Sequence, residues 1–104
     1  MPYSSGTWIV KAGREDEFTQ AWGEFAAWTV DEVDGALWAV LLRDEADPRR
    51  FVSMGPWETR ESIDAWRQLP EFKTAFGEMK DMVESVDVHV LDAAFEIGGA
   101  APDA

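Results

Sequence analysis

The sequence of 104 residues contains no cysteine. Disulfides, thiolate nucleophiles, iron–sulfur clusters and zinc–thiolate sites are therefore excluded, and a reducing cytoplasm is the expected compartment. Asparagine is also absent, and histidine and tyrosine occur once each, as His89 and Tyr3. The chain shows no metal-ligand spacing and no Gly-rich phosphate-binding motif, so neither a metal nor another cofactor is expected.

Basic residues are few, with 9 Lys and Arg against 21 Asp and Glu, and the net charge is −12. A phosphate backbone or an anionic membrane surface would be repelled, so neither nucleic acid nor a membrane is an expected partner. The opening residues lack the basic and apolar regions of a signal peptide, and no apolar run approaches the roughly 20 residues that span a bilayer. We expect a single domain over residues 1–97 and a flexible small-residue tail over residues 98–104.

Aromatic residues, by contrast, are abundant, at 12% of the chain with six tryptophans. Large rings bury much apolar area, so they suit a compact core, an apolar ligand cavity or a subunit interface.

Hydrophobic spacing gives the order of elements. Phe18, Trp22, Phe25 and Thr29 form one helical stripe, and Phe72, Phe76, Met79 and Val83 form another. Thr59 is a suitable N-cap for the helix that contains Trp66, and Pro70 suits the first position of the next helix. The predicted strands are residues 3–10, 36–43, 51–56 and 85–97, and the first predicted helix is residues 14–29. The resulting order, β-α-β-β-α-α-β, predicts a ferredoxin-like α+β fold with an antiparallel sheet.

The predicted strand over residues 36–43, ALWAVLLR, is apolar on both faces. Leu37, Ala39 and Leu41 are expected on one face, and Trp38, Val40 and Leu42 on the other. A strand of this kind is buried on both faces, and helices on one side can cover only one of them. The second face therefore predicts a homodimer that pairs through its sheets.

Two segments, RDEADPRRFVSMGPWETRESIDAWRQLPEF and TWIVKAGREDEFTQAW, resemble the antibiotic biosynthesis monooxygenase-like family. The resemblance extends from about residue 3 to residue 97 and implies a dimeric α+β barrel. Some members of that family oxidise polycyclic aromatic intermediates of polyketide pathways with O₂ and without metal or flavin, and some degrade haem. The haem branch pairs a tryptophan matching Trp66 with a later axial His. Here Phe72 and Phe76 occupy that neighbourhood, so haem degradation is not expected.

The resemblance implies a cofactor-independent monooxygenase acting on a planar aromatic or polyketide-type molecule in an apolar pocket. The expected substrate-binding residues are Trp22, Trp38, Met54, Trp66 and Phe76. Trp66 and His89 are the candidate catalytic residues, with His89 or an indole N–H as the polar contact. Two other functions stay open at this point. The lack of Asn and the isolation of His89 favour a non-catalytic module that binds a hydrophobic ligand or assists another enzyme. The second is a polyketide cyclase or isomerase that uses the same pocket for acid–base chemistry, which a pocket-facing His89 would favour.

The remaining charged residues are expected outside the pocket. Arg43, Asp44, Asp47, Arg49 and Arg50 surround the loop between two strands, where ion pairs that fix the turn are the expected role. Arg67 follows Trp66 about 100° further around the helix, which predicts a surface position. Asp87 shares a strand face with His89 at a spacing of two.

Overall fold

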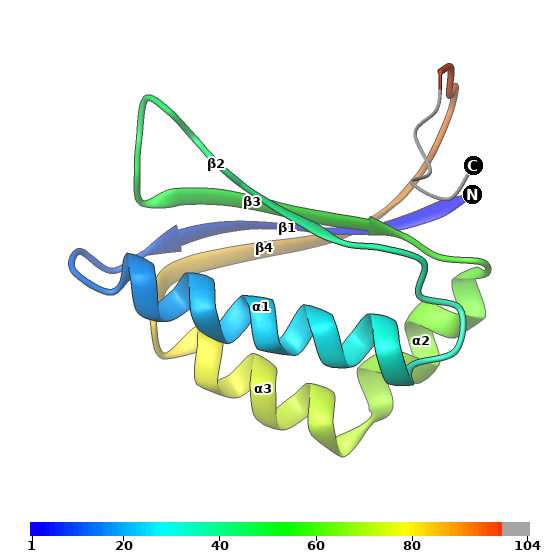
Figure 1. Cartoon of the computed structure of the whole chain (residues 1–104), viewed down its shortest axis with the longest axis horizontal. Coiled ribbons are helices and arrows are strands. Elements are labelled where there is room, and N and C mark those ends of the chain that lie inside the picture. The colour runs from blue at the N-terminus through cyan, green and yellow to red at the C-terminus, as the bar shows by residue number, and fades with distance from the viewer. Residues whose placement is uncertain (99–104) are drawn as a thin grey trace.

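A computed structural model describes residues 1–98 and has one four-stranded antiparallel sheet with three helices packed on one of its faces (Figure 1). This architecture confirms the predicted ferredoxin-like α+β fold and its order of elements. The elements are β1 (Pro2–Val10), α1 (Glu15–Glu32), β2 (Val40–Arg43), β3 (Arg50–Pro56), α2 (Arg60–Gln68), α3 (Pro70–Lys80) and β4 (Val83–Asp92).

The sheet has the strand order β2-β3-β1-β4, so β1 and β3 are its central strands. Trp8 of β1 pairs with Phe51 of β3 on one side and with Val86 of β4 on the other. Paired residues share a face of the sheet and successive residues alternate between faces. Gly6, Trp8 and Val10 are buried, which identifies their face as the one under the helices.

The strand predicted over residues 36–43 is regular only from Val40 onward. Ala36 makes an isolated bridge with Trp57, and the chain between these pairings holds one residue more than the strand it faces. Such an extra residue is a β-bulge, and it shifts the alternation of side chains. The ring of Trp38 lies 6.5 Å from that of Tyr3, on the helix-free face that Val40 shares, and Trp38 also borders the hollow beside the sheet edge.

The helix ends follow the local signals in the sequence. The Thr59 hydroxyl accepts a hydrogen bond from the backbone N–H of Ser62 at 3.1 Å, which confirms the predicted N-cap. Pro70 occupies the first turn of α3, where a missing N–H costs nothing. Helix α1 carries three acidic residues in its first turn, favourable to the helix dipole, and runs to Glu32 rather than ending at Thr29.

The last strand is shorter than predicted. It ends at Asp92, and the chain that follows leaves the sheet and extends away from the helices (Figure 1). Phe95 and Ile97 in this segment are both 83% exposed. The predicted tail lies outside the described residues except for Gly98.

The core lies between the sheet and the helices and is rich in rings. Phe18 of α1 is fully buried, with its ring 5.1 Å from that of Trp8 and 5.3 Å from that of Phe51. Burying one such side chain contributes roughly 1.5–3 kcal/mol, so this three-ring contact anchors α1 to the two central strands. None of the helices in residues 1–98 is long and apolar enough to cross a membrane.

The loop between β2 and β3 is fixed by its own charged side chains. The Arg50 guanidinium lies 3.2 Å from an Asp44 carboxylate oxygen, and Arg43 Nε donates to the carbonyl oxygen of Pro48 at 2.8 Å. The backbone N–H of Ala46 donates to Asp44 at 2.8 Å. These contacts confirm the predicted turn-fixing role for Arg43, Asp44 and Arg50, whereas the Arg49 side chain leaves the loop and pairs with Glu84 of β4 at 2.7 Å.

Candidate ligand-binding cavity

A cavity of about 250 Å³ lies between the helix-covered face of the sheet and the helices. Five of the six tryptophans line it, namely Trp8, Trp22, Trp38, Trp57 and Trp66. Trp28 is the exception and borders a separate hollow between α1 and α3. A dry apolar cavity of about 150 Å³ can hold one benzene ring, so this cavity is large enough for a small fused-ring molecule.

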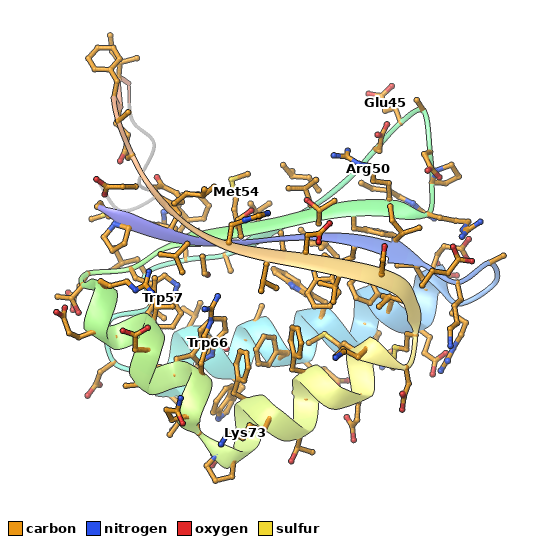
Figure 2. The ribbon with its side chains drawn as sticks, turned by 180° about the vertical axis from the view of Figure 1, so that it is seen from behind. Glu45, Arg50, Met54, Trp57, Trp66 and Lys73 are labelled. Atoms are coloured by element: carbon orange, nitrogen blue, oxygen red, sulfur yellow. The ribbon has the colours of Figure 1, made fainter. Side chains whose placement is uncertain are left out.

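Trp66 stands at the centre of the aromatic wall. Its ring lies 4.8 Å from the ring of Trp57, 4.7 Å from that of Phe72 and 5.6 Å from that of Phe25, measured between centroids. Figure 2 shows Trp57 and Trp66 between the helices and the sheet. Offset and edge-to-face contacts at these distances stabilise ring pairs, so the wall is held in one arrangement before any ligand enters.

The indole N–H groups of Trp8, Trp57 and Trp66 donate to hydroxyl groups. Trp66 Nε1 donates to Thr29 Oγ1 at 3.1 Å, and that hydroxyl donates to the Phe25 carbonyl oxygen at 2.9 Å. Trp8 Nε1 donates to Ser53 Oγ at 3.0 Å. Within the described chain, no buried side-chain nitrogen or oxygen lacks a partner. Because an unpaired buried donor is costly, these bonds fix the orientation of the rings that make them.

Two serine hydroxyls give the cavity polar contacts. Ser4 Oγ accepts a hydrogen bond from Trp57 Nε1 at 3.0 Å, and within residues 1–98 its own proton has no acceptor. Ser53 donates only a long bond, 3.5 Å, to the Gly6 carbonyl oxygen. Both hydroxyls line the cavity and can therefore donate to an oxygen atom of a bound molecule.

Gly6 keeps the cavity open at the sheet. A Cβ added there would lie 2.9 Å from Trp8 Nε1 and 3.0 Å from Ser53 Oγ. Any side chain at this position would push against the hydrogen bond between these two groups. Because Gly6 has no side chain, the cavity stays open at the sheet and the Trp8 ring keeps its orientation.

All five residues predicted to bind substrate border the cavity: Trp22, Trp38, Met54, Trp66 and Phe76. Met54 pairs with Ser5, and its side chain lies on the helix-free side of the sheet in Figure 2. Met54 therefore borders the cavity with its backbone. The role of these five residues in substrate binding stays a prediction.

His89 lies on the other face of the sheet and does not line the cavity. It pairs with Ser5, whereas the neighbouring Val88 pairs with Gly6 on the helix side. The physical reason is strand alternation, because the apolar residues beside His89 take the positions that face the helices. The expectation that His89 supplies the polar contact in the pocket is corrected by this placement, and the cyclase hypothesis loses the support that a pocket-facing His89 would have given it. Asp87 shares the face of His89, as predicted.

Arg67 lines the cavity, so the prediction of a surface position away from the pocket is wrong. Ser4 and Ser53 were also missed. The spacing of Ser4, Gly6 and Trp8 by two along one strand is the signal that could have placed Ser4 beside the rings.

Titratable groups with shifted pKa values lie outside the cavity. Burial, followed by the nearby Glu96 carboxylate, raises the pKa of Tyr3 above 10.0. Hydrogen bonds from the Ala46 N–H and from Arg50 hold the pKa of Asp44 below 3.8. In the described part of the chain, no group of three or more His, Asp or Glu side chains is placed to hold a metal ion.

Solved structures with the same fold include a protein from Deinococcus radiodurans assigned to the antibiotic biosynthesis monooxygenases. It is 22% identical, with 94% of this chain and 97% of that chain covered and a TM-score of 0.83. SnoaB, a cofactor-independent oxygenase from Streptomyces nogalater, is 16% identical over 92% of this chain and 95% of its own, with a TM-score of 0.84. A Nitrosomonas europaea protein with the same assignment is 19% identical, over 91% of this chain and all of its own, with a TM-score of 0.80.

Comparison with curated protein sequences finds no match. The model of the antibiotic biosynthesis monooxygenase family matches residues 5–78, which include most of β1, all of α1 and the segment that carries Trp57, Trp66, Phe72 and Phe76. With this match over more than two thirds of its length, the chain belongs to the antibiotic biosynthesis monooxygenase family.

Proposed function

We propose that the protein is a cofactor-independent monooxygenase that oxidises a planar aromatic, polyketide-type molecule in the cavity between sheet and helices. The observation that carries this proposal is the cavity itself, walled by five tryptophans and supplied with hydroxyl donors on one side. Apolar pockets with a few converging polar groups are typical small-molecule sites. The relationship to SnoaB, itself a cofactor-independent oxygenase, supports the same reaction class.

The proposed reaction needs no electron source besides the substrate. A methylene carbon between two aromatic rings loses a proton, and the resulting anion reduces O₂ and forms a carbon–oxygen bond. The hydroperoxide then loses water and leaves a carbonyl group, so one oxygen atom enters the product and the other enters water. The four electrons taken up by O₂ come from the carbon that becomes the carbonyl.

In this proposal the protein holds the substrate flat and keeps water away. The ring of Trp66 stacks on the substrate, since it stands at the centre of the aromatic wall. The free hydroxyl proton of Ser4 donates to the substrate oxygen as negative charge develops on it. His89 has no part, because it lies across the sheet.

We also propose that two copies pair through the helix-free face of the sheet. That face carries Leu42 and Leu91, which are 48% and 51% exposed in one chain. The segment after β4, with Phe95 and Ile97, extends beyond the sheet and would reach the second copy. Light scattering should give twice the chain mass of 11.7 kDa, and a mass of one chain would contradict the pairing.

Oxygen uptake tests the reaction directly. An anthrone-type substrate should consume O₂ faster with the protein than by spontaneous oxidation in buffer. The Trp66→Phe variant should lose most of that rate, because it removes part of the ring that stacks on the substrate. Trp28→Phe is the matched control, since Trp28 lies outside the cavity, and it should keep the rate. Equal rates in both variants would contradict the role of Trp66.

One observation favours a second function, that of a non-catalytic module binding a hydrophobic ligand. Among the described residues that line the cavity, none is an acid or a histidine that could remove a proton. Tight binding of an anthrone-type molecule with no O₂ uptake above the buffer rate would establish this alternative.

A further inference from the structure

Within residues 1–98, Arg67 is the one charged side chain that lines the cavity. The chain has 21 Asp and Glu residues, yet none of those in the described chain lines the cavity. Arg67 does line it, close in sequence to two rings of the wall, Trp66 and Phe72. Although the net charge of the chain is −12, Arg67 is the single charged residue among the described residues that line the cavity, and it is positive.

Arg67 has no internal partner among residues 1–98. It makes no ion pair and donates no side-chain hydrogen bond there. Asp64, three residues earlier on the same helix, is 3.5 Å from Arg60 instead. Arg67 lies in the last turn of α2, where the helix dipole favours a cation. The dipole accounts for a positive charge at this end of the helix but leaves the guanidinium donors unused.

The guanidinium is well suited to one class of ligand group. It is planar, always charged and donates in a fork that matches an anionic oxygen group such as a carboxylate. Arg67 is half-buried, so part of its hydration is already lost and an anion that reaches it competes with less water.

The proposed reaction gives this charge a role. No lining group among the described residues can act as a base, so a ligand that reacts as an anion must ionise with help from elsewhere. A nearby guanidinium favours the charged form of an acidic oxygen group and lowers its pKa.

We propose that Arg67 is the anion-recognising residue of the cavity, and that its ligands are fused-ring molecules carrying one acidic oxygen group. This proposal rests on the proposed function, because it assumes that the cavity holds an aromatic molecule. It adds the substrate class: the aromatic body fills the tryptophan-lined space and the anionic oxygen meets Arg67 at its edge.

The test compares two probes of the same shape by calorimetry: 2-naphthoate, which is an anion, and 2-naphthamide, which is neutral. Arg67→Gln should weaken 2-naphthoate binding about tenfold, which corresponds to one charge-assisted hydrogen bond, and leave 2-naphthamide within about twofold. Arg60→Gln makes the same charge change on the same helix outside the cavity and should leave both affinities unchanged. Added salt should weaken the naphthoate complex more than the amide complex.

The outcomes separate the two proposals. Suppose the wild type binds both probes, but Arg67→Gln and Arg60→Gln lower the naphthoate affinity equally or not at all. That result would overturn the role of Arg67 while the cavity function stands. A wild-type protein that binds neither probe would overturn both. Circular dichroism of each variant verifies that the helices persist, so a loss of binding is not a loss of fold.

Discussion

The hydrogen bond from Trp66 to Thr29 can be tested by removing one hydroxyl. Thr29 is buried, and its Oγ1 accepts from Trp66 Nε1 at 3.1 Å. Thr29→Val keeps the side-chain shape and the β-branch but leaves the indole N–H without its acceptor. A buried donor without a partner costs about 1–3 kcal/mol. Water in the neighbouring cavity can reach part of the ring, so we expect a loss of about 1–2 kcal/mol in the free energy of unfolding.

The loss should be visible in both denaturant and thermal unfolding. For a domain of this size a change of 1 kcal/mol shifts Tm by about 4–8 °C. Thr29→Val should therefore melt about 5–10 °C below the wild type, and Thr29→Ser, which keeps the hydroxyl, should lose less.

A double-mutant cycle isolates the bond from other effects of the substitution. Trp66→Phe removes the indole N–H, so Thr29→Val made in that background orphans no donor and should be nearly neutral. The coupling energy between the two positions should be about 1–2 kcal/mol. A coupling energy within about 0.3 kcal/mol of zero would refute the reasoning, because it would mean that the indole N–H finds water as easily as Thr29.

Two further predictions concern the backbone and pH. Gly55→Ala should destabilise the protein by about 1–3 kcal/mol in urea unfolding, because the added Cβ would lie 2.5 Å from the Trp38 carbonyl oxygen. Gly77→Ala should stabilise the protein by about 0.5–1 kcal/mol, because Gly77 has open space around it in α3. Equal effects at the two glycines would contradict the bulge. The pKa of Asp44 is lowered by the Ala46 N–H and by Arg50, so Asp44 stabilises the folded state above the ordinary carboxyl value of 3.8 and loses that contribution as pH falls below it. Wild-type Tm should therefore fall more steeply than that of Asp44→Asn in this acid range, and parallel curves would show that the loop contacts do not persist in solution.

The elements of the fold could be predicted because their signals are local. The stripe of Phe18, Trp22 and Phe25 identifies α1 by its spacing, and Thr59 and Pro70 identify helix starts by their own chemistry. The bulge before Val40 could not be predicted. It follows from how that chain pairs with β3, which no local pattern encodes.

The candidate cavity was only partly predictable for the same reason. The rings that line it were identified by helical spacing, but their hydroxyl partners are distant in sequence, as Ser4 is from Trp57. His89 is the instructive error. Val86, Val88 and Val90 alternate around it, and this pattern alone indicates that His89 faces away from the helices. The cytoplasmic location expected from the lack of cysteine stays a prediction.

The central claim is that the cavity between sheet and helices binds a fused-ring molecule, and the indole N–H signals in a nitrogen–proton correlation spectrum test it most directly. Six such signals are expected, one for each tryptophan. Titration with 2-naphthamide should shift the signals of the cavity residues, with Trp57 and Trp66 moving most and Trp28 least. Six unmoved signals, or a shift confined to Trp28, would contradict the claim.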